Sequence, residues 1–370
     1  MERSPLSFVR HIVLPDILLI TLIATQPPTP TRFLGFAVVL YASVTALACT
    51  AGGATTNYSI GFLLGIQVFT ALRFLWLERP LDVHRHERDG QPPREMSIWR
   101  RLYWAFCLDH GFRGVGWTHQ VKNVPPRPTE HPGVFIGQCL LRALWYFLLA
   151  DAANTYVCAV DGIHPQGYAL RTSISTAWIC VTYAMLNSEY LALAALAVAL
   201  RIGRPEDWPD IFGSASEAFT LRNFWGKVWH QNLRRLFVPL GQRIAQAWGF
   251  KRGTLLSSYT QLYAAFVVSG VIHSSGDAMV GRAYTGVSMP FFLLQAAAIT
   301  GEDAVVALGR RLGIAPSRAV KTLGYVWVFG WISATFSMYR DLSIETGWDW
   351  SAEWPISPSS GLLRMVGVLS

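Results

Sequence analysis

Long apolar segments alternate with charged loops along almost the whole chain. A helix needs about 20 mostly apolar residues to cross a bilayer, and runs of about that length recur from one end to the other. This alternation predicts an all-α protein that crosses a membrane several times. The candidate spans are residues 11–26, 33–51, 59–77, 138–159, 174–200, 256–280, 286–300 and 322–340, of which the first and seventh are short.

Lysine and arginine concentrate in three loops, at residues 78–137, 201–255 and 301–321. With eight spans these loops fall on one side of the membrane, and the positive-inside rule places that side in the cytosol. An acidic C-terminal stretch with Asp349 and Glu353 then lies on the opposite side. We find no internal repeat of the kind from which many transporters are built, and we expect residues 1–370 to form one domain.

Composition supports a membrane protein. Of the 370 residues 52% are hydrophobic and 15% are charged, whereas soluble domains are nearer a quarter charged. The net charge of +8 is explained by the membrane-flanking loops, and since no nucleic-acid-binding motif is present we expect no nucleic-acid partner. The five cysteines contain no CxxC pair and predict no disulfide framework. We interpret the N-terminal apolar run as a first span rather than a removed signal peptide.

One histidine, His273, lies in the middle of a predicted span, within the stretch Ser269–Asp277. An ionisable group at that depth is costly and therefore indicates a functional site. In a helix, Ser269, His273 and Asp277 share one face, so that Asp277 or a serine hydroxyl can orient the imidazole. A neutral imidazole in a dry pocket suits a general base that removes the proton of a substrate hydroxyl. The alternative is a structural histidine bonded to a neighbouring helix.

A second stretch, residues 221–237, combines tryptophans with cations in a basic loop. As one continuous helix it is amphipathic, which favours a helix lying at the membrane interface. The functional alternative is that His230 and Asn232 point into a site whose cations attract an anionic ligand. One predicted face carries Trp225, Trp229, Leu233 and Leu236, and the other carries Asn223, Lys227, His230 and Arg234.

Three other sequence features give little evidence of a functional site. Asp109–Trp117 has three glycines in six residues, but no strand precedes it, so it predicts a turn rather than a dinucleotide site. His84 and His86 are the only close histidine pair and have no obvious third ligand, so we expect no metal site. No GxSxG motif supports a serine nucleophile.

Two motifs in this order and spacing resemble the membrane-bound O-acyltransferase superfamily, and within it the wax synthase-like branch. Asn223–Gln231 reads as an aromatic FW-x-x-x-WHQ stretch, and Ser269–His273 follows some forty residues later inside a span. Arg113–Trp117 is similar to the RGxGW element found upstream in that branch. These three motifs are short and lie between Arg113 and His273.

The resemblance implies a polytopic fold with a central tunnel and an acyl-CoA-dependent transferase without a bound cofactor. His273 matches the catalytic histidine. His230 matches a second polar position, where many members carry Asn or Asp, and it positions substrate or stabilises the oxyanion. The CoA phosphates are expected near Lys227, Arg234 and Arg235. The substrate-binding positions that we expect are Asn223, Trp225, Lys227, Trp229, Gln231, Asn232, Arg234, Ser269 and Asp277.

Members of this size in the branch include fungal enzymes that acetylate hydroxyls of terpenoids and meroterpenoids in secondary metabolism. The resemblance therefore favours transfer from acetyl-CoA to a lipophilic alcohol that arrives through the lipid bilayer, in a multi-pass protein of the endoplasmic reticulum. Other members esterify long-chain alcohols, which is the first alternative. A second alternative is a transporter in which His273 and Asp277 relay protons.

Overall fold

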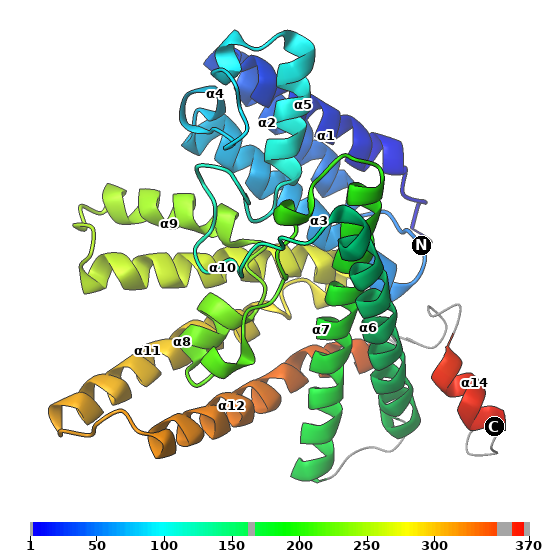
Figure 1. The fold of residues 1–370 in the computed structure, drawn as a ribbon, viewed down its shortest axis with the longest axis vertical. Helices are drawn as coiled ribbons and strands as arrows, with labels where there is room; N and C mark the ends of the chain where they lie inside the picture. Colours follow the sequence, from blue (N-terminus) through cyan, green and yellow to red (C-terminus); the bar gives the residue numbers. More distant parts are fainter. Residues whose placement is uncertain (1–2, 162–166, 346–356, 366–370) are drawn as a thin grey trace. The chain divides into compact units, whose positions relative to one another are not determined.

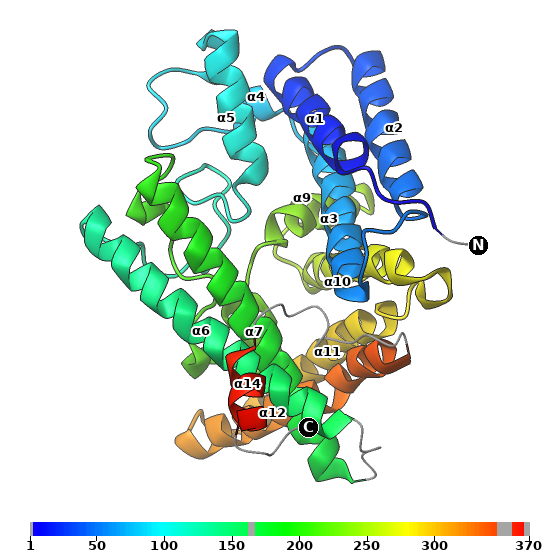
Figure 2. The same cartoon turned by 90° about the vertical axis from the view of Figure 1, so that its right-hand side faces the viewer.

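The chain folds into helices joined by turns and loops (Figures 1 and 2). The computed structural model describes residues 3–161, 167–345 and 357–365, and these residues form no β-strand. Two compact units divide the chain: the first comprises 1–122 and 231–315, and the second comprises 123–230 and 316–370. Each unit is thus assembled from two separate stretches of sequence. That residues 1–370 act as one domain stays a prediction.

The first unit contains the N-terminal helices and the helices that follow the second basic loop. In chain order these are a π-helical turn at Val9–Val13, α1 (Leu14–Thr25), α2 (Thr29–Ala46), α3 (Ala54–Leu72), a π-helical turn at Arg73–Leu77, α4 (Pro80–Val83), a 3₁₀ turn at Pro93–Glu95, α5 (Ile98–His110), α9 (Arg234–Ala247), α10 (Leu255–Val280), a 3₁₀ turn at Arg282–Tyr284 and α11 (Met289–Arg311).

The second unit contains two long helices and the C-terminal helices. In chain order these are α6 (Pro132–Asp161), α7 (Tyr168–Ala199), 3₁₀ turns at Pro205–Asp207 and Ala215–Glu217, α8 (Leu221–Asn223), a π-helical turn at Phe224–Val228, α12 (Arg318–Glu345) and α14 (Pro358–Met365).

Five helical segments within the described residues are long and apolar enough to cross a membrane: Ala54–Leu77, Pro132–Val160, Tyr168–Ala199, Leu255–Val280 and Arg282–Arg311. Each overlaps one of the predicted spans, which confirms a polytopic all-α membrane protein. The predicted spans at 11–26, 33–51 and 322–340 are also helical, as α1, α2 and α12, but are not among these five. The count of eight spans and the central tunnel stay predictions, and Asp349 and Glu353 lie outside the described residues.

In the first unit, α10 packs against α3, α9 and α11. Thr254 caps its start by accepting a hydrogen bond from the Ser257 amide at 3.3 Å, and an apolar run then carries the helix to Val280. Small residues allow the close approach of α3. A Cβ atom added to Gly61 would collide with the carbonyl oxygen of Ser275, and one added to Gly65 would lie 3.1 Å from the Ile272 Cα atom.

This Gly61–Gly65 pair is a GxxxG motif, which lets two membrane helices approach at backbone distance. These two glycines determine which face of α3 packs against α10. The apolar side chains beside this contact form a small core with the start of α9: Ile66, Leu233, Leu236, Val268 and Ile272 are all buried.

In the second unit, α6 and α7 pack along most of their length as an antiparallel pair (Figure 2). Small side chains such as Ala143, Ala194 and Ala195 lie in their contact, and Phe135 and Leu191 fill the space between them. The Ser188 hydroxyl donates to the Ala143 carbonyl oxygen at 2.9 Å, so a polar group inside the pair is satisfied.

Candidate active site

His273 lies on α10, on the face that packs against α3 and α11. Its Nδ1 atom is 2.7 Å from the carbonyl oxygen of Ser269, one turn earlier. Phe62 of α3 and Phe292 of α11 contact the imidazole, with ring centroids 4.8 and 4.4 Å away. The ring is therefore held by its own helix and by one aromatic side chain from each neighbour.

The contact with Ser269 determines which nitrogen of His273 acts as a base. A carbonyl oxygen only accepts hydrogen bonds, so Nδ1 carries the proton and donates it. In the neutral imidazole the lone pair then resides on Nε2. This is the tautomer that a general base needs if Nε2 faces a substrate hydroxyl.

Asp277 has a different role from the one expected. Its carboxylate is fully buried and accepts hydrogen bonds from the Ser288 amide at 2.9 Å and from the Ser288 hydroxyl at 2.7 Å. Ser288 precedes the first residue of α11, so Asp277 fixes the turn between α10 and α11. The expectation that Asp277 orients His273 is not met, because the Ser269 carbonyl oxygen takes that place.

The predicted continuous helix over 221–237 is wrong. α8 passes into the π-helical turn Phe224–Val228, and Trp229 then adopts an extended conformation with φ −66° and ψ 149°. A new helix, α9, begins only at Arg234. Trp229 therefore belongs to the second unit, whereas Leu233 and Leu236 lie in the core of the first, and the four residues share no helix face.

His230 ends the first stretch of the second unit and lies among aromatic side chains. Its ring centroid is 5.5 Å from that of Trp229 and 5.9 Å from that of Phe212. Trp229 also contacts Phe224 and Trp225 at 5.8 and 6.0 Å. The aromatic residues of the motif thus form one cluster that contains His230.

The backbone next to this cluster is also closely packed. Gly213 donates from its amide to the Val228 carbonyl oxygen at 2.8 Å, and an added Cβ there would collide with the Lys227 carbonyl oxygen. The Asn223 amide donates to the Thr220 hydroxyl at 3.0 Å. The Lys227 ammonium group donates to Glu217 at 2.9 Å, and both side chains are exposed, so this lysine remains accessible to solvent.

Gln231, Asn232 and Arg234 belong to the first unit, with Ser269, His273 and Asp277. Gln231 is buried and accepts a hydrogen bond from the Arg234 guanidinium at 2.9 Å. Asn223, Trp225, Lys227, Trp229 and His230 belong to the second unit. The structure thus groups the predicted site residues into two sets, each held in its own unit.

Arg235 does not reach a surface phosphate. It is 4% exposed, and it donates to the Leu108 carbonyl oxygen at 3.1 Å. Burial lowers its pKa to about 10, although Asp109 counteracts this. The expectation that Arg235 lies near the CoA phosphates is therefore wrong, because its guanidinium is buried inside the first unit and donates to a backbone carbonyl oxygen there.

The glycine-rich segment after α5 is a turn, as predicted, and it has a specific packing role. Gly114 and Gly116 adopt φ values of +58° and +78°. A Cβ at Gly114 would lie 2.8 Å from Nε2 of His119, and one at Gly116 would lie 2.7 Å from Nε2 of His86. These glycines let the backbone pass directly over two imidazoles.

Sequence reasoning missed the buried polar group behind this turn. His84 and Arg73 both contact Glu78 Oε2, at 2.6 and 3.0 Å. Burial alone would raise the pKa of Glu78, but the hydrogen bonds and charges of His84 and Arg73 outweigh it and lower the pKa. The His119 ring packs against His84, with centroids 4.5 Å apart. Arg73, Glu78 and His84 lie within twelve residues of one another, but they share no regular helical spacing, and His119 comes from a distant segment.

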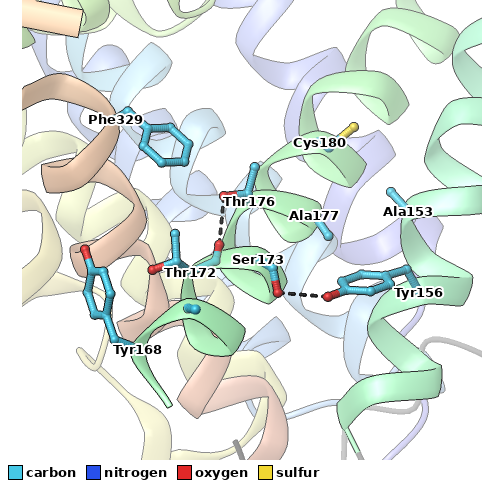
Figure 3. A pocket seen from close by; sticks show the side chains of 10 residues that line it. Ala153, Tyr156, Tyr168, Thr172, Ser173, Thr176, Ala177, Cys180 and Phe329 are labelled. Carbon is cyan, nitrogen blue, oxygen red and sulfur yellow. Dashed lines mark hydrogen bonds between the residues drawn. The ribbon is translucent and has the colours of Figure 1, made fainter. Parts of the chain in front are cut away.

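An open pocket of about 700 Å³ lies between α6, α7 and α12 in the second unit (Figure 3). Its wall is almost wholly apolar, and three of its hydroxyls bond within the protein: Tyr156 to Ser173 at 2.8 Å and Thr176 to the Thr172 carbonyl oxygen at 2.7 Å. A pocket with such a wall accepts hydrocarbon rather than a polar group. It is lined by Ala153, Tyr156, Tyr168, Ala169, Thr172, Ser173, Thr176, Ala177, Cys180 and Phe329.

Comparison with known proteins identifies the family. Residues 208–294, which include both His230 and His273, match the Membrane bound O-acyl transferase family. Acetyltransferase eriL of Hericium erinaceus is 32% identical over 290 residues, 74% of each chain. Acetyltransferase ple2 of Rhodocybe pseudopiperita is 31% identical over 330 residues, 86% of each chain. Acetyltransferase sirH of Emericella nidulans is 30% identical over 75% of this chain and 70% of its own.

The chain belongs to the membrane bound O-acyl transferase family. It is an integral membrane O-acyltransferase, and the family implies acyl-CoA as co-substrate and a lipophilic acceptor.

Proposed function

We propose that the chain transfers an acetyl group from acetyl-CoA to a hydroxyl of a lipophilic terpenoid or meroterpenoid, with His273 as the general base. The observation that carries this proposal is the hydrogen bond from His273 Nδ1 to the Ser269 carbonyl oxygen, which leaves the lone pair on Nε2. The choice of acetyl rests on the relatives, which are named acetyltransferases.

The reaction needs no covalent acyl-enzyme. Nε2 of His273 accepts the proton of the acceptor hydroxyl as its oxygen attacks the thioester carbonyl carbon. The tetrahedral intermediate collapses, the carbon–sulfur bond breaks, and an ester forms. The imidazolium returns its proton to the CoA thiolate, so the enzyme ends in its starting protonation state. The Nδ1–H bond to the helix backbone keeps the tautomer and ring orientation fixed throughout.

His230 takes the second polar role. Its imidazole, held among Trp229 and Phe212, donates a hydrogen bond to the thioester oxygen as negative charge develops, or positions the acceptor. The exposed Lys227 and the half-buried Arg234 are the cations left to bind CoA phosphates, since Arg235 is committed to the interior. We propose that Asn223, Trp225, Gln231 and Asn232 contribute to substrate binding around them.

The setting that we propose is the endoplasmic reticulum membrane, in a pathway of secondary metabolism. Acetyl-CoA approaches from the cytosol, where the basic loops lie, and the alcohol arrives through the bilayer. The apolar pocket between α6, α7 and α12 is compatible with such an acceptor, because its wall offers contact to hydrocarbon.

Activity in microsomes tests the proposal directly. Microsomes containing the parent chain, His273→Ala or His131→Ala are incubated with labelled acetyl-CoA and a panel of terpenoid and long-chain alcohols. A general base contributes about 10²–10⁴ in rate, so His273→Ala should lose at least about a hundredfold. His131 is exposed and lies outside the motifs, so its variant should match the parent. Acyl transfer that survives His273→Ala unchanged would contradict the mechanism.

The same assay determines the acyl group and acceptor class. Mass spectrometry of the products, with acetyl-CoA and palmitoyl-CoA offered together, reports the mass gained by each alcohol. We expect acetyl esters of terpenoid alcohols. Products that carry only the long acyl chain, on long-chain alcohols, would instead assign the chain to wax ester synthesis.

A further inference from the structure

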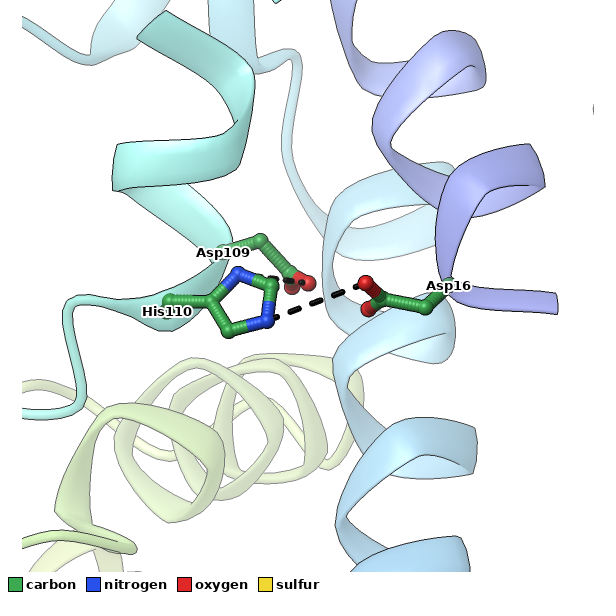
Figure 4. A group of neighbouring side chains, drawn as sticks. All are labelled: Asp16, Asp109 and His110. Carbon is green, nitrogen blue, oxygen red and sulfur yellow. Dashed lines mark ion pairs between the residues drawn. The ribbon is translucent and has the colours of Figure 1, made fainter. Parts of the chain in front are cut away.

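Three metal-ligating side chains meet in the first unit, where α1 passes the end of α5 (Figure 4). They are Asp16 from α1 and Asp109 and His110 from α5, and one ligand atom from each lies within 4.8 Å of the other two. The proposed acyl transfer uses none of them. Asp16 is far from the other two in sequence, which is why the spacing of histidines and acids along the chain indicates no metal site.

The His110 ring is fixed so that its lone pair faces Asp16. Nδ1 lies 3.1 Å from the Phe106 carbonyl oxygen, to which it donates its proton, and the ring stacks on Phe106 with centroids 4.4 Å apart. In the neutral ring this leaves the lone pair on Nε2. Nε2 lies 3.7 Å from Oδ2 of Asp16. Two atoms that both carry lone pairs therefore face each other.

Asp109 adds a buried carboxylate, one oxygen of which has no hydrogen-bond partner. The residue is 7% exposed, and its Oδ1 atom has no hydrogen-bond partner. Figure 4 shows its carboxylate directed between Asp16 and His110. Its Oδ2 is 3.7 Å from Nδ1 of His110, whose proton is already donated to Phe106. The nearby Arg235 guanidinium donates instead to the Leu108 carbonyl oxygen. Leaving a buried carboxylate oxygen unpaired is costly, so Asp109 calls for a partner there, either a cation or a proton shared with Asp16.

The spacing fits two ligands of one metal ion. Ligand atoms about 2.1 Å from a metal lie about 3.4 Å apart at the tetrahedral angle and about 4.2 Å apart when opposite. The 3.7 Å between His110 Nε2 and Asp16 Oδ2 falls between these values, and it is too long for a hydrogen bond. Both side chains are partly exposed, at 43% and 27%, so these two residues leave room around an ion for further ligands.

We propose that Asp16, Asp109 and His110 bind a divalent transition-metal ion of the zinc type. Two carboxylates and an imidazole suit such an ion better than Mg²⁺ or Ca²⁺, which prefer oxygen ligands alone. The ion joins α1 to the end of α5, immediately before the turn that carries Arg113–Trp117. It has a structural role, and its presence does not depend on which acyl group the enzyme transfers.

Metal binding is measured on the full chain, purified in detergent and dialysed against EDTA. We expect Zn²⁺ to bind with a stoichiometry of one by calorimetry and to raise the thermal unfolding midpoint by roughly 2–4 °C. Mg²⁺ at the same concentration should do neither. No response to Zn²⁺, as expected if the two carboxylates merely share a proton, would overturn the proposal, and so would an equal response to Mg²⁺.

Variants locate the site. Asp16→Asn and His110→Gln each keep a polar side chain of similar size at a partly exposed position, and each should weaken Zn²⁺ binding about tenfold or more. Asp82→Asn is the matched control, because Asp82 is an acidic residue that pairs with Arg94 at 2.6 Å away from the cluster, and it should bind Zn²⁺ like the parent. Binding that persists unchanged in both cluster variants would place the ion elsewhere and contradict the assignment.

Discussion

At the scale of the residue, a main-chain acceptor on its own helix helps to orient the imidazole of His273. Nδ1 donates to the Ser269 carbonyl oxygen, an acceptor that every residue at position 269 would provide. Phe62 and Phe292 then restrict the ring on either side. The hydroxyl of Ser269 has no place in this arrangement, although the residue itself is buried.

Ser269→Ala should therefore leave catalysis nearly intact. The substitution removes a hydroxyl and retains the carbonyl oxygen, so we expect kcat within roughly twofold of the parent, a change of less than about 0.5 kcal/mol in the barrier. The measurement is the acyl transfer rate in microsomes, beside His273→Ala. A loss in Ser269→Ala as large as that in His273→Ala would show that the hydroxyl takes part.

The sequence predicted which histidine is embedded, because depth follows from the apolar run around it. It did not predict the partners of the neighbouring polar groups. Asp277 bonds to Ser288, which follows in the next turn of the chain, and Arg235 bonds to the Leu108 carbonyl oxygen on another helix. Both partners depend on how helices pack, and helical spacing within one segment carries no information about that.

At the scale of the element, the stretch 221–237 shows why periodicity can mislead. Its apolar and polar residues recur at helical spacing, yet Trp229 is extended and the helix is interrupted. The local reason is visible in the second unit, where Gly213 donates to the Val228 carbonyl oxygen and Phe212 packs against Trp229. Contacts with a distant segment thus outweigh the intrinsic preference for one helix.

The approach of α3 to α10 depends on glycine. Gly61→Ala places a methyl group against the carbonyl oxygen of Ser275, a backbone atom that cannot rotate away. We expect destabilisation of about 1–3 kcal/mol and a loss of activity, because α3 also carries Phe62, which contacts His273. Thermal unfolding in detergent and the acyl transfer rate measure the two effects.

Gly301→Ala is the control for that substitution. Gly301 lies in α11 of the same unit, and a Cβ added there meets no atom within 4 Å. Because alanine favours a helix by about 1 kcal/mol over glycine, this variant should be as stable as the parent or more so. If Gly61→Ala and Gly301→Ala have the same unfolding midpoint and acyl transfer rate, close packing at Gly61 does not stabilise the contact between α3 and α10.

At the scale of the whole molecule, hydropathy was sufficient to predict the class of fold. Apolar length alone marks α6, α7, α10 and α11 and the helix at Ala54–Leu77, because a bilayer imposes the same requirement on each. The division into two units of two stretches each was not predicted, since it depends on contacts between segments far apart in the chain.

Global stability should fall in mild acid because of His119. Both of its ring nitrogens lack hydrogen-bond partners, and burial, together with the charges of Arg73, His84 and Arg235, lowers its pKa. The unfolded chain binds a proton near pH 6.5 that the folded chain does not. His119 therefore favours unfolding increasingly as the pH falls below about 6.5, by at most about 1.4 kcal/mol per pH unit, and it has no such effect above that pH.

The measurement is the unfolding midpoint between pH 7.5 and 5.5 for the parent, His119→Phe and His131→Phe. The parent and His131→Phe should lose stability with similar slopes, while His119→Phe should show a shallower decline, whatever its stability at pH 7.5. Identical slopes in all three proteins would mean that His119 binds its proton over the same pH range in the folded and the unfolded chain.

The packing of α3 against α10 also constrains the biosynthesis of the chain. Gly65 and Ile272 meet at backbone distance, but about 200 residues separate them. At about 5–20 residues per second the ribosome needs roughly 10–40 s to reach α10 after α3 has emerged. During that interval the α3 surface at Gly61 and Gly65 lacks its partner helix. We expect lipid or a membrane-insertion factor to cover this surface until α10 is made. Chains that terminate before residue 255 lack α10, so their Gly61–Gly65 surface stays without its partner helix. We expect cellular quality control to recognise such chains by this surface.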